Sequence, residues 1–437
     1  MYLLKERIPH LTILLTAIIL VFASSNINWG RQHWKNIIKA DGKGYYAWLP
    51  AFFIYNDLHF DFFNQIEKEK YFSEELYYDY RVVVNNKTTN KYFVGTALLQ
   101  APFFLVAHLI SNITNNDTDG YSKWYAIFIN IAAIFYALAG LLFTNQLLKT
   151  FSINSINRGI TLLLFSFATN LFYYVVGEPA MSHIYSFACI SAFLHYASKL
   201  KEGKNAMYIL SVLLALIVLV RPVNIIIVGI LPFFFSGFKD FFITILSPIK
   251  RIFLSVIIFI AITSTQPLLY FYQTGMFFPD TYPGEHFNFL NPHIISFLFS
   301  FKKGLFLYSP IILISLIGIY IIFHQNKFKG FSIMFFISIL IYVLSSWWNW
   351  WYGGSFSARV ILDYLSVFML VFSATLENSK KSLRYSLITF SAFCLILCQI
   401  QTYQYRYYII HWENMNLELY LKSIHSIFFL NFDLCFL

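Results

Sequence analysis

The chain has 437 residues, of which 58% are hydrophobic and 12% are charged, and its mean hydropathy is +0.61. Soluble domains carry about 25% charged residues, so half that share, spread over repeated apolar runs, excludes an ordinary soluble enzyme and indicates a polytopic membrane protein. The formal net charge is +10, but Lys and Arg stand in short clusters between the apolar runs, as in cytoplasmic loops. No basic stripe with interleaved aromatic residues occurs, which argues against nucleic-acid binding.

Twelve apolar runs follow one another along the chain, and most approach the ~20 residues that cross a hydrocarbon core. If every run crossed, most basic clusters would lie outside the cell, against the positive-inside rule. The runs lie at about 9–25, 94–111, 122–148, 159–176, 180–198, 206–221, 223–238, 252–273, 304–324, 331–348, 359–376 and 385–403.

The charge pattern fits if the run 94–111 does not cross. Gly95, the Gln100-Ala101-Pro102 break and His108 also make it a poor span, so we expect it to lie at the outer interface or against the bundle. We therefore predict an all-α polytopic membrane protein with about 11 transmembrane helices. The clusters then placed in the cytoplasm are Lys5/Arg7, Lys149/Arg158, Lys199 to Lys204, Lys239/Lys250/Arg251, Lys327/Lys329 and Lys380/Lys381/Arg384.

This topology gives a transmembrane domain over 1–408, in the inner (cytoplasmic) membrane, with its N-terminus in the cytoplasm. The external parts are a large first loop with juxtamembrane helices (26–121), two further loops (274–303 and 347–358) and a C-terminal tail (409–437) that suits an interfacial helix. Ionisable residues collect at the external ends of the apolar runs. Such residues are costly near lipid and by default mark functional sites, so we expect one external, periplasmic cavity.

Asp41 stands in Ala-Asp-Gly-Lys-Gly-Tyr-Tyr-Ala-Trp, just after the first apolar run. A carboxylate at this place can accept a proton from a hydroxyl or amine nucleophile. It could equally be the N-cap of a helix over 44–54. Tyr45, Tyr46 and the aromatic residues after them suit a helix that lies along the membrane surface.

The predicted external turn at 177–183 carries Glu178 and His183. Three interpretations stay open: a capped helix start with a hydrogen-bonded histidine, a substrate-binding or acid/base pair, and a metal site shared with Asp41 or His286. The last has no strong ligand spacing. Glu285 and His286 add two more polar side chains in the loop 274–303.

Lys302 and Lys303 break the positive-inside pattern, and external lysines suit a lipid phosphate or are simply solvated. The tryptophan-rich stretch 347–352 is either an aromatic belt at the interface or a platform for a sugar ring. Arg359 and Asp363 are four residues apart, so we expect them to pair on a helix. Arg359 could instead hold a phosphate.

Several motifs together resemble bacterial multi-pass glycosyltransferases of the GT-C fold, in the neighbourhood of the protein mannosyltransferase and aminoarabinose transferase families. The resemblance covers about 26–365. Its motifs are the acid before a Tyr-Tyr helix (41–46), Gly-x-Ala-Leu-Leu-x-Ala-Pro-Phe-Phe (95–104), Met-Ser-His (181–183), Lys-Gly-Leu-Phe-Leu-Tyr-Ser-Pro (303–310) and Trp-Trp-x-x-Trp-Tyr-Gly-Gly-Ser-Phe-x-x-Arg (347–359).

The resemblance implies a polyprenyl-phosphate-linked sugar donor and transfer on the external face. In those families the first external loop carries an acidic pair. Here Asp41 takes the first position and Gly42 the second, which weakens a metal role and makes Glu178 or Glu285 a candidate for the missing charge. No cofactor or metal ligand is predicted, with a divalent metal as the alternative.

We therefore expect a glycosyltransferase of cell-envelope glycans that moves a hexose or pentose to a lipid, glycan or protein acceptor. A flippase for a lipid-linked glycan, or a glycan polymerase or ligase, is the alternative. Charges at the helix ends and no clear inverted repeat favour the enzyme over the flippase. Asp41 is the expected catalytic base, and the expected substrate-binding residues are Tyr45, Tyr46, Glu178, His183, Arg221, Glu285, His286, Lys302, Lys303, Tyr308, Trp348, Trp351 and Arg359.

Overall fold

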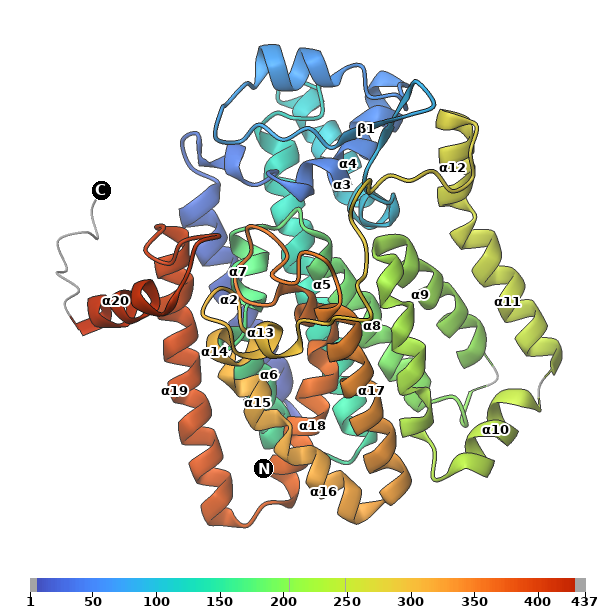
Figure 1. Ribbon diagram of the computed structural model, residues 1–437, viewed down its shortest axis with the longest axis vertical. Coiled ribbons are helices and arrows are strands. Elements are labelled where there is room, and N and C mark those ends of the chain that lie inside the picture. Colours follow the sequence, from blue (N-terminus) through green and yellow to red (C-terminus); the bar gives the residue numbers. More distant parts are fainter. Residues whose placement is uncertain (1–5, 204, 248, 429–437) are drawn as a thin grey trace.

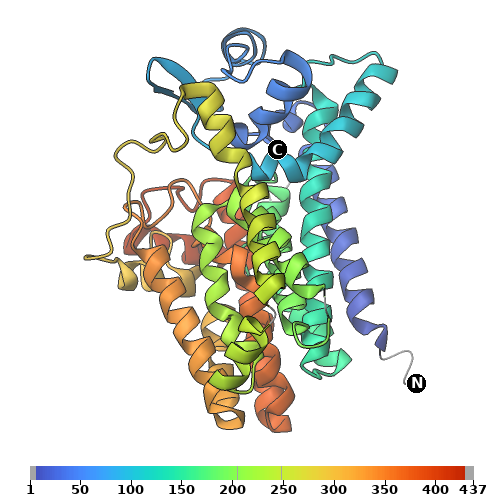
Figure 2. The ribbon, with the colours of Figure 1, turned by 90° about the vertical axis from the view of Figure 1, so that its right-hand side faces the viewer.

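The computed structural model describes residues 6–203, 205–247 and 249–428. In this part of the chain the only sheet is a two-stranded hairpin, and helices make up most of the rest. The helices run side by side as a bundle, and residues 29–122 form a cap of shorter elements over one end (Figures 1 and 2). We call this the loop end of the bundle. The predicted all-α polytopic membrane fold is confirmed.

Seven helices of the described chain are long and apolar enough to cross a membrane, or eight if the bent pair η4–α10 counts as one span. The seven are α2 (Ile8–Asn28), α4 (Gly95–Ile113), α5 (Lys123–Thr150), α11 (Ile249–Thr263) with α12 (Thr265–Thr274), α17 (Lys327–Ser345), η5 (Arg359–Tyr364) with α18 (Leu365–Asn378), and α19 (Lys381–Arg406).

Shorter or broken helices make up further segments of the bundle and lie beside the long ones (Figure 1). These are α6 (Ser155–Phe167) with α7 (Leu171–Val176), α8 (Ser182–Ser198), α9 (Ala206–Val220), η4 (Pro222–Phe234) leading into α10 (Phe238–Leu246), and α15 (Pro310–Ser315) with α16 (Ile317–Gln325). By length and composition the described residues support seven or eight spans, and the number of about 11 crossings stays a prediction.

Helix α4 lies across the loop end, although its length and composition would allow a span. Its first residue, Gly95, packs on the backbone of Leu219 and Val220, where α9 ends. The Tyr136 hydroxyl of α5 donates a hydrogen bond to the Leu99 carbonyl, 2.8 Å away. Both views show α4 among the cap elements, beyond the ends of α8 and α9 (Figures 1 and 2). That this segment does not cross the membrane stays a prediction of the charge pattern, because α4 is also a candidate span.

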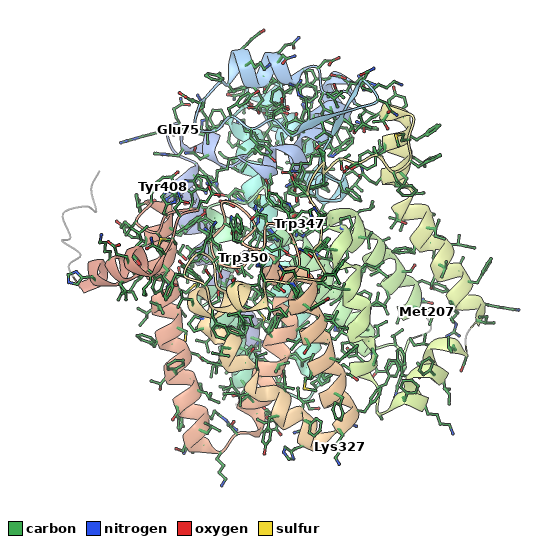
Figure 3. All side chains as sticks on the ribbon, viewed as in Figure 1. Glu75, Met207, Lys327, Trp347, Trp350 and Tyr408 are labelled. Atoms are coloured by element: carbon green, nitrogen blue, oxygen red, sulfur yellow. The ribbon has the colours of Figure 1, made fainter. Side chains whose placement is uncertain are left out.

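Basic clusters gather at the opposite end of the bundle. Lys149, Arg158, Lys381 and Arg384 line one cavity there, and Lys327 marks the same end in Figure 3. Lys5 and Lys204, which belong to the predicted clusters, lie outside the described residues. The grouping follows the positive-inside pattern, while the side of the membrane that each end faces stays a prediction.

A β-hairpin in the cap positions Lys91 and Tyr92, which come directly after it. Strand β1 (Arg81–Val84) pairs antiparallel with β2 (Lys87–Asn90). Asn85 and Asn86 form the turn with φ of 51° and 58°, a conformation that asparagine tolerates and that matches the twist of a hairpin. Lys91 and Tyr92 follow directly. The other cap elements are η1 (His33–Asn36), α3 (Asp41–Pro50), η2 (Ala51–Tyr55) and η3 (Asn64–Lys70).

The two later loops join into one wall at the loop end. Phe287 and Trp347 form an antiparallel bridge, and the Trp348 N–H donates to the His286 carbonyl at 3.0 Å. Three short helices complete this end: α13 (Ile294–Phe299), α14 (Leu305–Tyr308) and α20 (Leu417–Phe428). Residues 429–437 of the predicted tail lie outside the described residues.

The docking of α4 on α9 gives a first prediction. A Cβ at Gly95 would lie 2.2 Å from the Leu219 carbonyl carbon and 2.3 Å from the Val220 nitrogen, and backbone atoms cannot rotate away. Gly95→Ala should therefore destabilise the purified protein by about 1–3 kcal/mol, measured by thermal unfolding in detergent. Gly237→Ala is the control, because nothing lies within 4 Å of its Cβ. Equal melting temperatures for the two variants would contradict this packing.

Candidate active site at the loop end

Asp41 joins two segments that are far apart in the sequence. Its Oδ1 accepts a hydrogen bond from the Tyr92 hydroxyl at 2.9 Å, and its Oδ2 binds Arg359 Nη2 at 2.8 Å. Asp41 stands in the first turn of α3, after the N-cap residue Ala40, and α3 has no side-chain cap. Both carboxylate oxygens of Asp41 therefore bind side chains from other segments. The interpretation of Asp41 as a helix N-cap is not borne out.

The backbone before Asp41 is in a rare conformation. Ala40 has φ 47° and ψ −137°, a region that residues with a Cβ seldom adopt and that costs of order 1–3 kcal/mol. Such strain persists where the surrounding structure enforces it, and it is concentrated at functional sites. Here it turns the chain into α3 with Asp41 as the first residue of that helix.

Two glycines let α3 approach its neighbours. A Cβ at Gly42 would lie 2.7 Å from Ala180 Cβ, and one at Gly44 would lie 2.1 Å from the Tyr92 ring. Because Gly44 has no side chain, the Tyr92 ring can pack on α3 and reach Asp41. Gly42 explains the departure from the acidic pair of the families that the chain resembles, because the turn at Ala180 leaves no room for a second acidic side chain.

Asp41 lines a cavity of about 540 Å³. Six parts of the chain build it: α3, Tyr78 before the hairpin, the residues after the hairpin, the start of η4, the wall of two joined loops and Arg359 at the start of η5. Figure 3 shows Trp347 of this wall where the cap meets the bundle. Most of the lining is aromatic or charged: Asp41, Tyr45, Tyr78, Lys91, Tyr92, Phe93, Arg221, Tyr282, Glu285, His286, Phe287, Trp347, Trp348, Tyr352 and Arg359.

A buried carboxylate holds the second arginine of the cavity. Asp363 is fully buried, and its Oδ2 atom lies 3.3 Å from Arg221 Nε. His183 Nδ1 and Asn224 Nδ2 each bind Asp363 at 2.7 Å. The predicted pairing of Arg359 with Asp363 is wrong. The segment η5 is a 3₁₀-helix with three residues per turn, so residues four apart face different directions.

The charges around Asp41 keep it ionised. Burial raises the pKa of this carboxyl group, but the Arg359 guanidinium and the Tyr92 hydrogen bond outweigh burial and hold it below its usual value. Burial, reinforced by the Asp41 charge, raises the pKa of Tyr92 well above its ordinary value. At neutral pH the pair is therefore a carboxylate acceptor and a protonated phenol donor.

Half of the predicted site residues line the cavity, and they come from four parts of the chain. These residues are Asp41, Tyr45, Arg221, Glu285, His286, Trp348 and Arg359.

The structure places the other predicted residues behind the walls of the cavity, bound to protein groups. Their contacts are Tyr46 with the Gly120 carbonyl, Glu178 with the Tyr173 hydroxyl, His183 with Asp363, Lys302 with the Trp351 ring, Lys303 with the Ser355 carbonyl, and Tyr308 with the Phe301 carbonyl. Burial lowers the pKa of Lys303 to about 7.

The sequence did not single out several lining residues. Lys91, which pairs with Glu285, and Tyr92 reach the cavity through the register of the hairpin. Tyr282 lines it because its loop folds back against the tryptophan-rich stretch. The two adjacent asparagines, Asn85 and Asn86, indicate a hairpin turn. No sequence pattern around Tyr282 indicates that it lines the cavity.

The described ranges contain no group of three or more His, Cys, Asp or Glu residues that could hold a metal ion. Both oxygens of Asp41 are bound by other side chains. The Asp41 carboxylate thus accepts hydrogen bonds from a hydroxyl group and a guanidinium group.

No protein-family model and no curated protein matches the chain. Two crystal structures of the Archaeoglobus fulgidus oligosaccharyltransferase are similar to it. The complex with zinc and sulfate has 11% identity and a TM-score of 0.47, covering 90% of this chain and 53% of the other. The apo form has 10% identity and a TM-score of 0.44, with 96% and 54% covered.

The chain thus spans about half the length of these oligosaccharyltransferase chains. With TM-scores below 0.5, neither likeness assigns a function to this chain.

The Tyr92–Asp41 bond gives a second prediction. A depressed carboxyl pKa contributes stability at neutral pH that is lost as the pH falls through the folded-state pKa. Tyr92→Phe should lower the unfolding free energy by about 1.5–3 kcal/mol at pH 7, and by less below about pH 4. Tyr71→Phe, which removes a hydroxyl bond to Asp119 outside the cavity, is the control. Tyr92→Phe in an Asp41→Ala background, which has no acceptor for the Tyr92 hydroxyl, should cost little, and an undiminished cost there would contradict the assignment.

Proposed function

We propose that this protein is a membrane glycosyltransferase that moves a hexose or pentose from a polyprenyl-phosphate donor to a lipid, glycan or protein acceptor. We place the reaction on the external face of the inner membrane, as the charge pattern predicts. One observation carries the proposal. The carboxylate of Asp41 is bound to Arg359 inside an aromatic-lined cavity that also contains Arg221.

The cavity suits a sugar in size and lining. Its volume of about 540 Å³ lies within the range of about 300–1,000 Å³ found for small-molecule sites. The rings of Tyr45, Tyr92, Trp347, Trp348 and Tyr352 line it, and flat aromatic faces pack on the C–H faces of a sugar ring. The few charged groups among them would fix the orientation of the sugar.

The two arginines suit the donor phosphate. A guanidinium matches the geometry of phosphate oxygens and stays charged at all relevant pH values. Arg359 uses Nη2 on Asp41, while its Nε is buried and has no hydrogen-bond partner among the described residues. Arg221 is held by Asp363. Both would stabilise the charge that develops on the phosphate as the donor bond breaks.

The chemistry follows from these roles. The acceptor oxygen or nitrogen attacks the anomeric carbon of the donor sugar, and the bond from that carbon to the phosphate oxygen breaks. The electron pair leaves with the polyprenyl phosphate, which Arg359 and Arg221 stabilise. Asp41 first orients the acceptor hydroxyl by accepting its hydrogen bond and then takes its proton. Because the Asp41 pKa is depressed, this proton transfer would come late, when the acceptor has become acidic.

An apolar stripe leads from the cavity along η4 and suits the lipid part of the donor. Side chains three residues apart share one face of a 3₁₀-helix. Pro222 lines the cavity, and Ile225 and Val228 continue its face with 47% and 38% of their surface exposed. A second face, a third of a turn away, carries Asn224, Ile227, Ile230 and Phe233, all buried. Pro222, Ile225 and Val228 form what we call the η4 stripe.

The catalytic role of Asp41 is tested directly. Purified protein is incubated with polyprenyl-phosphate-linked hexoses and pentoses and with membrane extract as acceptor, and the released polyprenyl phosphate is quantified. Asp41→Asn should lower release by about 100-fold or more. Asp61→Asn, which changes an exposed carboxylate of the same loop, should leave release unchanged. Wild-type release from Asp41→Asn would refute the base assignment, and no release by the wild type from any donor would refute the proposed function.

The η4 stripe is tested with donors of two chain lengths. Ile225→Ser combined with Val228→Ser should raise KM by about tenfold for a long isoprenoid donor, with kcat little changed. KM for a short isoprenoid donor should stay as in the wild type. Leu14→Ser combined with Ile18→Ser also replaces two exposed apolar side chains, on α2, and serves as control. An equal effect on both donors would argue against lipid binding along η4.

A further inference from the structure

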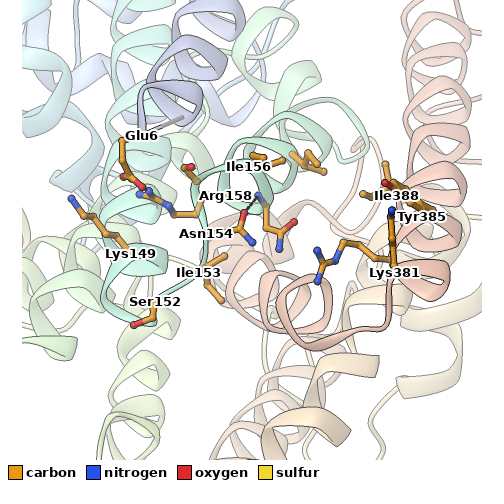
Figure 4. A pocket seen from close by; sticks show the side chains of 14 residues that line it. Glu6, Lys149, Ser152, Ile153, Asn154, Ile156, Arg158, Lys381, Tyr385 and Ile388 are labelled. Atoms are coloured by element: carbon orange, nitrogen blue, oxygen red, sulfur yellow. Dashed lines mark hydrogen bonds and ion pairs between the residues drawn. The ribbon is translucent and has the colours of Figure 1, made fainter. Parts of the chain in front are cut away.

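A second cavity, of about 1090 Å³, lies at the end of the bundle opposite the active site. It is bounded by the turn between α5 and α6, the start of α19 and Glu6 before α2 (Figure 4). We propose that this basic cavity binds the phosphate headgroup of an anionic phospholipid. The inference concerns a binding site outside the sugar-transfer reaction and does not depend on it.

The charge of the basic cavity is strongly unbalanced. Four cationic side chains line it, Lys149, Arg158, Lys381 and Arg384, against one carboxylate, Glu6. Glu6 already binds Arg158 Nη2 through Oε2 at 2.8 Å. Three of the four cations therefore have no carboxylate partner in the lining, and the Glu377 carboxylate beside it accepts hydrogen bonds from Asn154 and Asn157 instead.

The two arginines are held in place by other groups. Arg158 is only 3% exposed, and its Nη1 donates to Asn145 Oδ1 at 3.0 Å. Arg384 Nη2 donates to the Glu377 and Ser379 carbonyls at 3.2 and 3.3 Å. The Nε atoms of both arginines are buried without a hydrogen-bond partner in the described ranges. The fixed guanidinium groups thus retain unused donors, as in a site prepared for an anion.

The two lysines are exposed and can adjust to a bound anion. Across the described residues neither Lys149 nor Lys381 takes part in an ion pair, and Lys381 only approaches the Tyr385 ring, at 5.9 Å. Figure 4 shows Lys149 on one side of the basic cavity and Lys381 on the other, with Arg158 between them. An anion in the middle would be reached from both sides.

The wall of the basic cavity favours a phospholipid over a free anion. Ile156, Ile160 and Ile388 line it beside the charged groups, and they stand on α6 and α19, which pass through the bundle. Ile156 and Tyr385 are exposed, so acyl chains would find apolar contacts directly next to the cations. The sequence predicts that this end faces the cytoplasm, where anionic lipids give the leaflet its negative surface potential.

The full-length protein, purified in a neutral detergent, is titrated with phosphatidylglycerol and bound lipid is counted by native mass spectrometry. Phosphatidylcholine and inorganic phosphate are separate arms. Lys149→Gln combined with Lys381→Gln should weaken phosphatidylglycerol binding by about 25-fold, roughly fivefold for each lysine. The control variant combines Lys250→Gln with Lys327→Gln. It removes two exposed lysines that lie outside the basic cavity and should bind as the wild type does.

Three outcomes would overturn the proposal. Equal binding of phosphatidylglycerol and phosphatidylcholine by the wild type would remove the charge argument. Equal losses in the two double variants would show that the lysines act only through the overall charge of this end. Saturation by inorganic phosphate with displacement of the lipid would assign the basic cavity to a free anion. Both variants change exposed side chains, so the fold is expected to persist, and their melting temperatures verify it.

Discussion

The ion pair between Asp41 and Arg359 connects the cap to the bundle, and the geometry of the site depends on it. It joins residues that are 318 positions apart and brings α3 over the start of η5. Arg359 is largely buried, so its charge would be costly without this partner. The same pair sets the ionisation of Asp41. Fold and chemistry thus share one contact, because the interaction that closes the cap also keeps the carboxylate charged.

A second buried carboxylate, Asp363, lies outside the cavity and binds Arg221, which lines it. Asp363 binds Arg221, His183 and Asn224, and Asn224 also accepts from the Tyr364 hydroxyl. Such contacts are strong in the low dielectric of the protein interior, so they restrain the side chains that make them. The two arginines of the cavity are therefore each fixed by a different carboxylate, one inside the cavity and one beneath it.

How far the sequence predicts the site depends on the kind of signal. Charges are rare in apolar runs, so Arg221 and Arg359 stood out, and the positive-inside rule placed them at the same end as Asp41. Charge alone does not say which way a side chain points, and Lys303 and Glu178 lie behind the walls for that reason. Tyr92 depends on the register of a hairpin, and Arg359 pairs with Asp41 because η5 is a 3₁₀-helix. These are properties of tertiary packing, which local pattern does not encode.

The regular period of η4 constrains how this part of the chain can vary. At a rise of ~2.0 Å per residue, its 13 residues extend ~26 Å, whereas an α-helix of that length would extend ~20 Å. One inserted or deleted residue would turn every later side chain by a third of a turn, moving the buried face into the open. Evolution along η4 should therefore proceed by substitution rather than by changes in length. Tolerance to polar residues should rise and fall every third position, a signature that an alignment of close homologues would reveal.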